Sequence, residues 1–329
     1  MKIKLSSVIK YTLSLAAAAV LVYFAFRGVD WGAFWQGLKQ TSWGWMAVYA
    51  VASIGALFFR RLRWSSILKP LDASIRPLTV WDANNIGNIV NVVIPSVGEF
   101  TRCGIVSTKK ATYDKAFGTI ACERLCDTVA VIILFIVTIA VDRGTFSSFF
   151  AENIWGPLSE GLSFSLGWIV GGVVLLLAAF IWAMFHWREK SRFCGKVAGA
   201  ISGLGAGFVS FSKMEHKSLF ALYTLGIWVM YIIMYTCVLK AIPATAHLPF
   251  TAALFITAVG NVASIIPVPG GIGAYHYLVA LTIESLFGLT HDVGILYATL
   301  NHEAHAILII ILGAISWIAW TLRRRTKAA

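Results

Sequence analysis

Long apolar runs separated by short polar and basic segments fill most of the 329-residue chain. A membrane-spanning helix needs about 20 mostly apolar residues. Six runs meet this length, at about 8–26, 42–59, 117–141, 167–187, 219–240 and 293–321. Two further apolar stretches, at about 78–96 and 251–288, are broken by Pro and Gly. The pattern predicts an all-α integral membrane protein, one polytopic domain over residues 1–329 with about six full transmembrane helices and two broken ones.

The composition excludes an ordinary soluble protein. Hydrophobic residues make up 58% of the chain and charged residues 13%, whereas a globular domain carries about 25% charged residues. Lipid, rather than water, must therefore cover most of the surface. The net charge of +12 does not indicate nucleic-acid binding, because the basic residues lie at the ends of the apolar runs. The five cysteines are odd in number, and Cys122 and Cys126 lie in an apolar run, so we expect reduced packing residues rather than disulfides.

Lysine and arginine are concentrated on one side of the predicted bundle. They cluster at residues 2–10, 60–76, 102–115, 188–217 and 323–327, whereas the opposite loops hold only Arg27, Lys39, Arg143 and Lys240. This asymmetry predicts a multi-pass protein of the cell inner membrane with both termini in the cytoplasm. Six full crossings fit only if each broken stretch enters and leaves on the same side. The first run resembles a signal peptide, but no small-residue cleavage site follows it, so we expect an uncleaved helix.

The two broken stretches resemble each other. Gly87-Asn88-Ile89 matches Gly260-Asn261-Val262, and at the same offset Gly98 matches Gly271. A polar stripe also matches, with spacing i, i+4, i+7 that puts each triplet on one helix face; its members are Asn84, Asn88 and Asn91 in the first copy and Thr257, Asn261 and Ser264 in the second. Each stretch then reaches a Pro/Gly break. The pattern predicts repeat-like halves at about 78–141 and 251–321.

Three full crossings separate the two copies, so the second copy is expected to be inverted and re-entrant from the opposite side. Inverted repeats with broken helices are typical of transporters, whose site lies at the repeat interface. A helix that ends inside the membrane leaves backbone groups that lipid cannot satisfy, so such an end must be buried or face a wet cavity. The alternative is a chance similarity between two broken helices whose Asn side chains bond neighbouring helices.

Ionisable residues within the apolar runs are the next candidates. Glu123, Arg124 and Asp127 open the 117–141 run, where Arg124 lies three residues before Asp127, within pairing reach. Glu99 and Arg102, just after the first break, have the same i, i+3 spacing and are expected to pair. Charges at membrane depth are costly and indicate function. The alternative is an interfacial cluster that anchors the helix end in water.

The last apolar run carries four polar residues within five positions, Asn301, His302, Glu303 and His305, which we expect to face the bundle interior. The HExH order misses the zinc-protease pattern by one residue and so lacks its i, i+4 ligand pair. A metal would need a further ligand such as His276, so we expect neither metal nor cofactor, and a proton-coupling role is favoured.

The glycines at 203–207 resemble a phosphate loop, but no strand precedes them; they lie in a predicted amphipathic surface helix within 188–218.

Three elements in this order resemble a known family: Asn84 to Arg102 with its Pro break and Gly98-Glu99, Glu123-Arg124 with Asp127, and Pro267-Val268-Pro269-Gly270-Gly271-Ile272-Gly273. They resemble the transmembrane region of lysylphosphatidylglycerol synthases, a family that includes flippase-like proteins. The resemblance implies movement of lipids between leaflets, notably aminoacylated phosphatidylglycerol. Ser96 and Val97 stand where many members carry Arg. The chain ends soon after its last run, so we expect no soluble aminoacyltransferase domain and no synthase activity.

Our hypothesis is a lipid flippase in which a polar headgroup, aminoacylated or glycosylated, moves along a groove between the two broken helices. The candidate substrate-binding residues are Asn84, Asn88, Asn91, Glu99, Arg102, Glu123, Arg124, Asp127, Asn261, Ser264, Pro267, Pro269, Gly270, Gly271, Gly273, His302 and Glu303. Two alternatives stay open. One is a membrane-embedded lipid-modifying enzyme that uses the carboxylates and the His302 cluster; the other is a non-catalytic partner of a lipid-modifying or glycosyl-transferring enzyme. The expected partners are membrane lipid and, in the last alternative, the lipid-modifying enzyme; no nucleic acid is expected.

Overall fold

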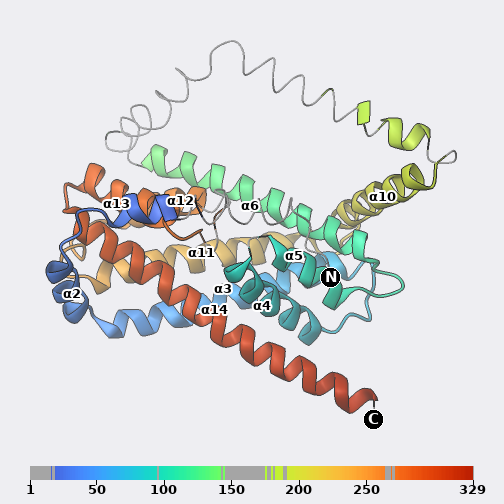
Figure 1. Ribbon diagram of the computed structural model, residues 1–329, viewed down its shortest axis with the longest axis horizontal. Helices are drawn as coiled ribbons and strands as arrows, with labels where there is room; N and C mark the ends of the chain where they lie inside the picture. The colour runs from blue at the N-terminus through green and yellow to red at the C-terminus, as the bar shows by residue number, and fades with distance from the viewer. Residues whose placement is uncertain are drawn as a thin grey trace.

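The computed structural model describes residues 16, 19–94, 96–141, 144, 175, 179–180, 182–187, 191–263, 268 and 271–328. These ranges contain helices and no strand. The labelled helices are α2 (Trp31–Gln40), α3 (Trp43–Leu68), α4 (Pro77–Val93), α5 (Val97–Val106), α6 (Tyr113–Val141), α10 (Arg192–Ser212), α11 (Lys217–Ala241), α12 (Phe250–Ala263), α13 (Ala274–Phe287) and α14 (His291–Ala328). The predicted all-helical class is confirmed for this part of the chain (Figure 1).

Four described helices, α3, α6, α11 and α14, are long and apolar enough to cross a membrane. They confirm the runs predicted at 42–59, 117–141, 219–240 and 293–321. Only 11% of the most apolar window of α6 and of α14 is buried inside the protein, so most of their apolar side chains face outward, as lipid contact requires. The predicted run at 167–187 and the start of the run at 8–26 lie largely outside the described residues.

Each of the two broken stretches forms a pair of short helices. Pro77 stands in the first turn of α4, where its missing N–H is not needed. α4 ends at Val93, and Ser96 adopts a left-handed conformation (φ 64°) that reverses the chain into α5. In the second stretch, Gly271 (φ 76°) and Gly273 (φ 85°) provide the left-handed backbone before α13. At 1.5 Å per residue α4, the longest of the four, is about 25 Å long, short of the roughly 30 Å hydrocarbon core.

The two helix pairs enter the bundle from opposite ends (Figure 1). At one end, Lys69 after α3 pairs with Glu215 before α11, and Thr108 after α5 donates to Asp72 before α4 at 2.7 Å. At the other end, the Ser42 amide before α3 donates to the Ala241 carbonyl at the end of α11 at 2.8 Å. The short connections from α11 into α12 and from α13 into α14 lie at this second end. The α4–α5 pair therefore starts and finishes at the first end, and the α12–α13 pair at the second.

Helices α3 and α11 pack along each other and connect the two pairs. Gly55 leaves room for the Met230 sulfur, because a Cβ on this residue would lie 3.0 Å from that atom. Gly226 likewise leaves room for the Phe59 ring, whose nearest atoms would lie 2.9 Å from a Cβ on Gly226. One apolar core forms around α3, α11 and the α12–α14 segment, and a second around Trp64 of α3 with α4, α5 and α6. Because α3 contributes to both cores, it fixes the two helix pairs relative to each other.

The predicted surface helix within 188–218 appears as α10, which packs on α6. A Cβ added to Gly207 would lie 2.1 Å from the Lys115 carbonyl oxygen and 2.8 Å from the Cα of Gly118, so the two backbones touch. Of the glycines that resembled a phosphate loop, Gly203 and Gly207 thus serve the packing of α10 on α6, whereas Gly205 faces open space.

Candidate functional site

A cavity of about 720 Å³ lies where the two helix breaks approach each other. Val92, just before the first break, lines it together with Val262 and Ile272, which flank the second. Its polar lining comes from α3, α6, α11, α12, α13 and α14, and consists of Tyr49, Arg60, Arg124, Asp127, Thr128, Tyr231, Tyr235, Asn261, Tyr275, Asn301, His302, Glu303 and His305. Its volume is typical of sites that hold small molecules.

The cavity also has an apolar rim that faces outward. Ile132, Val262, Ile272 and Ile310 line it and are exposed by 53%, 36%, 38% and 43%. Exposed isoleucine and valine side chains in segments of this apolar character are expected to contact lipid tails. The site therefore joins a polar wall to an apolar mouth, which is the arrangement that an amphiphile needs.

A buried ion network borders the charged part of the wall. Arg63 of α3 donates from both terminal nitrogens to the two Asp127 oxygens, at 2.6 and 3.1 Å, and from Nε to Glu123 at 3.4 Å. Arg102 of α5 donates to the other Glu123 oxygen at 2.8 Å. The side chains of Arg63, Arg102 and Glu123 are at most 4% exposed, so each charge depends on its partner.

The ion pairs differ from those expected from sequence spacing. Arg124 reaches Glu99 of α5 at 3.0 Å instead of Asp127 on its own helix, and Arg102 reaches Glu123 instead of Glu99. Arg63, which the basic pattern placed in a loop, lies inside α3, because that helix continues to Leu68. Spacing within one helix cannot reveal these pairs, since their partners lie on different helices.

Two glycines let α4 and α5 cross closely beside this network. A Cβ on Gly98 would lie 2.0 Å from the Gly87 carbonyl oxygen, and a Cβ on Gly87 would lie 2.5 Å from the Arg102 side chain. Asn91 closes the break, because its Oδ1 accepts the Gly98 amide at 2.7 Å and its Nδ2 donates to Glu99 at 3.0 Å. Asn91 therefore satisfies backbone and carboxylate groups that the break exposes.

The second half has an uncharged counterpart. Gly260 faces Tyr275 and Tyr235, as Gly87 faces Arg102. Gly260 and Tyr275 have the same sequence separation as Gly87 and Arg102. Asn301 donates to the Tyr275 hydroxyl, as Arg102 donates to Glu123 across the first half. Tyrosine hydroxyls and an amide thus stand in the second half where the first half has charged groups.

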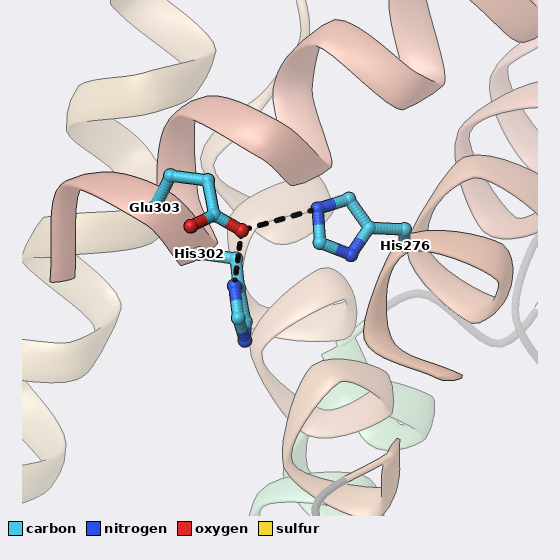
Figure 2. Close-up of side chains that lie close together, drawn as sticks. All are labelled: His276, His302 and Glu303. Carbon is cyan, nitrogen blue, oxygen red and sulfur yellow. Dashed lines mark hydrogen bonds and ion pairs between the residues drawn. The ribbon is translucent and has the colours of Figure 1, made fainter. Parts of the chain in front are cut away.

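Three polar side chains of α13 and α14 form a further cluster, of which His302 and Glu303 line the cavity and His276 is buried. Glu303 Oε1 lies 2.8 Å from His302 Nδ1 and 3.8 Å from His276 Nε2 (Figure 2). His305, one turn further along α14, instead contacts the Ser53 hydroxyl through Nδ1 at 2.9 Å. The expectation that the polar residues of the last apolar run face the interior is met by all four, since Asn301, His302, Glu303 and His305 line the cavity.

Residues 11–313 match the family described as the lysylphosphatidylglycerol synthase TM region. The chain belongs to this family. The match reaches all four helices that are long and apolar enough to cross a membrane, and the protein is a multi-pass membrane protein. No curated protein and no solved structure matches the chain.

The predicted site residues of this lysylphosphatidylglycerol synthase TM-region protein fall into four groups. Arg124, Asp127, Asn261, His302 and Glu303 line the cavity. Asn91, Glu99, Arg102 and Glu123 form the bonded layer behind it. Asn84 is buried in α4 with no partner for its Nδ2, Asn88 is partly buried, and neither is among the cavity-lining residues.

The remaining predicted residues lie at the second break. Gly271 and Gly273 hold left-handed backbone there, while Ser264, Pro267, Pro269 and Gly270 lie outside the described residues. The sequence interpretation missed Arg60 and the tyrosines at 49, 231, 235 and 275. Arg60 looked like a positive-inside anchor, and tyrosines within apolar runs carry no periodic signal that separates a cavity face from a lipid face.

Proposed function

We propose that this protein moves a polar-headgroup lipid between the leaflets of the cell inner membrane. The observation that carries the proposal is the cavity, whose polar wall comes from both halves of the chain and whose rim consists of exposed isoleucine and valine side chains. A headgroup needs hydrogen-bonding groups at membrane depth, while its tails need an uninterrupted apolar path. A cavity with these two surfaces satisfies both needs without exposing the headgroup to lipid.

In this proposal the α4–α5 and α12–α13 pairs are re-entrant from opposite sides and form the core of an inverted repeat. Their entry from opposite ends of the bundle supports this arrangement, as do the matching contacts of Gly87 with Arg102 and of Gly260 with Tyr275. The end that carries Lys69, Arg76 and the C-terminal arginines would face the cytoplasm, since basic residues are retained there. Broken helices that meet at mid-membrane are the common architecture of substrate sites in transporters.

Arg60 supports a phosphate-bearing headgroup. It lies on the cavity wall in α3 and makes no hydrogen bond or ion pair within the described part of the chain. Asp127 and Glu123 attract it from longer range, but both are already bonded to Arg63. A guanidinium group that retains free donors in a low-dielectric wall is suited to bind a phosphate oxygen pair.

A leaflet-exchange assay tests the proposal. The purified protein is reconstituted into liposomes with a fluorescent phospholipid, and an impermeant quencher reports how fast the probe changes leaflet. Asn261→Leu places an apolar side chain in the cavity wall and should slow exchange at least about tenfold, as expected when a polar contact of about 1.4 kcal/mol is lost from the rate-limiting step. Asn88→Leu is the matched control, because Asn88 occupies the equivalent position outside the cavity lining.

Equal exchange in liposomes with and without protein would contradict the proposal, as would exchange unaffected by Asn261→Leu and by a bulky Gly260→Trp that fills the cavity. Conversion of the lipid into a new product in detergent, where no leaflets exist, would contradict it in favour of an enzyme.

A further inference from the structure

We infer that His276, His302 and Glu303 form a binding site for a divalent transition metal of the zinc class at the edge of the cavity, which His302 and Glu303 line. One ligand atom from each of the three side chains lies within 4.8 Å of the other two. His276 comes from the first turn of α13, and the adjacent His302 and Glu303 come from α14 (Figure 2). The inference is independent of lipid movement, because it concerns only what these side chains bind.

The distances suit a tetrahedral ion. Zinc–nitrogen and zinc–oxygen bonds of about 2.0–2.1 Å place neighbouring ligand atoms of a tetrahedron about 3.3–3.4 Å apart. Glu303 Oε1 lies 3.8 Å from His276 Nε2 and 2.8 Å from His302 Nδ1, one distance above and one below this tetrahedral separation. Small rotations of the Glu303 side chain, which is 45% exposed, can equalise the two separations.

His276 supplies an independent indication of a ligand. Its side chain is only 2% exposed. Its Nδ1 has no hydrogen-bond partner, and Glu303 Oε1 at 3.8 Å is too far from Nε2 for a hydrogen bond. Burying an imidazole without partners is unfavourable. Nε2, on the opposite side of the ring from Nδ1, is the nitrogen that Figure 2 shows directed at the carboxylate, so an ion held between Nε2 and Glu303 would give the buried ring a partner on that side and leave Nδ1 unchanged.

The donor set and its position indicate the class of ion. Two imidazoles and one carboxylate favour zinc and its neighbours over magnesium or calcium, which prefer oxygen ligands. Three protein ligands leave a fourth position, and His302 and Glu303 line the cavity, so this position faces the cavity and is available to water or a phosphate oxygen. The HExH order within α14 lacks the second ligand of a zinc-protease helix, but α13 provides it from outside that helix.

Cobalt binding to the detergent-purified full chain tests the site. After removal of metal with a chelator, Co²⁺ should bind at one ion per chain with the visible absorption of a tetrahedral complex, and Zn²⁺ should displace it. His276→Gln and Glu303→Gln keep side-chain size and should each weaken binding more than about tenfold, since even loss of an outer-shell partner costs 10–100-fold. His305→Gln is the matched control on the same helix and cavity, outside the cluster.

Retention of the cobalt spectrum in His276→Gln, or loss of it only in His305→Gln, would overturn the inference. Absence of tetrahedral binding by the unmodified protein would overturn it as well. Thermal unfolding of each variant in detergent shows whether a loss of binding reflects a misfolded protein, and a well-folded Glu303→Gln variant with unweakened binding counts against the site. Leaflet exchange is measured separately, so failure of the metal site leaves the proposed lipid movement intact.

Discussion

Replacing Arg63 by Met should destabilise the protein by about 3–5 kcal/mol, the cost of removing one partner from a buried ion pair. Arg63 is 1% exposed and neutralises Asp127 through two hydrogen bonds, while Glu123 keeps a second partner in Arg102. The variant therefore leaves one carboxylate, that of Asp127, without a bonded cation near the cavity. Methionine retains most of the side-chain volume, so the loss reflects charge more than packing.

The measurement is reversible unfolding in detergent, followed by helical circular dichroism as denaturing detergent is added. Asp127→Asn in the Arg63→Met background should recover at least about 1 kcal/mol, because residues in one network couple by 0.5–3 kcal/mol. Lys69→Met is the control, since its pair with Glu215 is highly exposed (63% and 73%) and should contribute less than about 1 kcal/mol. A loss below about 1 kcal/mol for Arg63→Met, or strict additivity in the double variant, would refute the reasoning.

Further predictions concern the helix crossing, a loop carboxylate and the cavity wall. Gly98→Ala should cost about 1–3 kcal/mol in detergent unfolding, because its Cβ would meet the Gly87 carbonyl at 2.0 Å, whereas Gly104→Ala, with open space around it, should be neutral. Hydrogen bonds from two hydroxyl groups and one amide lower the pKa of Asp72 to about 2. The Asp72 carboxylate therefore stabilises the folded protein fully above about pH 4, and this stabilisation is lost towards pH 2. The difference in unfolding free energy between wild type and Asp72→Asn should shrink over that range. Arg60→Gln should raise the lipid concentration that half-saturates exchange, and Arg60→Lys should restore part of the effect; an unchanged value in both would remove Arg60 from the site.

Hydropathy was sufficient for the four confirmed spans and for the two broken stretches, because length and Pro/Gly interruption are local properties of the chain. The end of α3 was not predictable in the same way. Arg60 and Arg63 resemble basic residues of a cytoplasmic loop, but acidic partners on α6 allow the helix to continue and carry Arg63 into the bundle. A pattern within one stretch of sequence cannot predict an ion pair whose acidic partner, here Asp127, lies on another helix far along the chain.

The site shows the same limit. The candidate carboxylates and the polar group at His302 were recognisable because ionisable residues are rare in apolar runs. Tyr235 and Tyr275 were not, since tyrosine is common in membrane helices and its position relative to the cavity depends on helix packing. His276 could be named from the sequence only as an example of a further ligand, and its position 3.8 Å from Glu303 became visible only when α13 was found against α14.

The central claim is that the two helix pairs enter the membrane from opposite sides. Single cysteines in a cysteine-free background, at Leu78 and Lys109 around α4–α5 and at Phe250 and Thr290 around α12–α13, can be labelled with an impermeant maleimide in right-side-out and inverted vesicles. The account predicts that the first two positions react from the cytoplasmic face and the last two from the opposite face. Labelling of the two ends of either pair from different faces would contradict it.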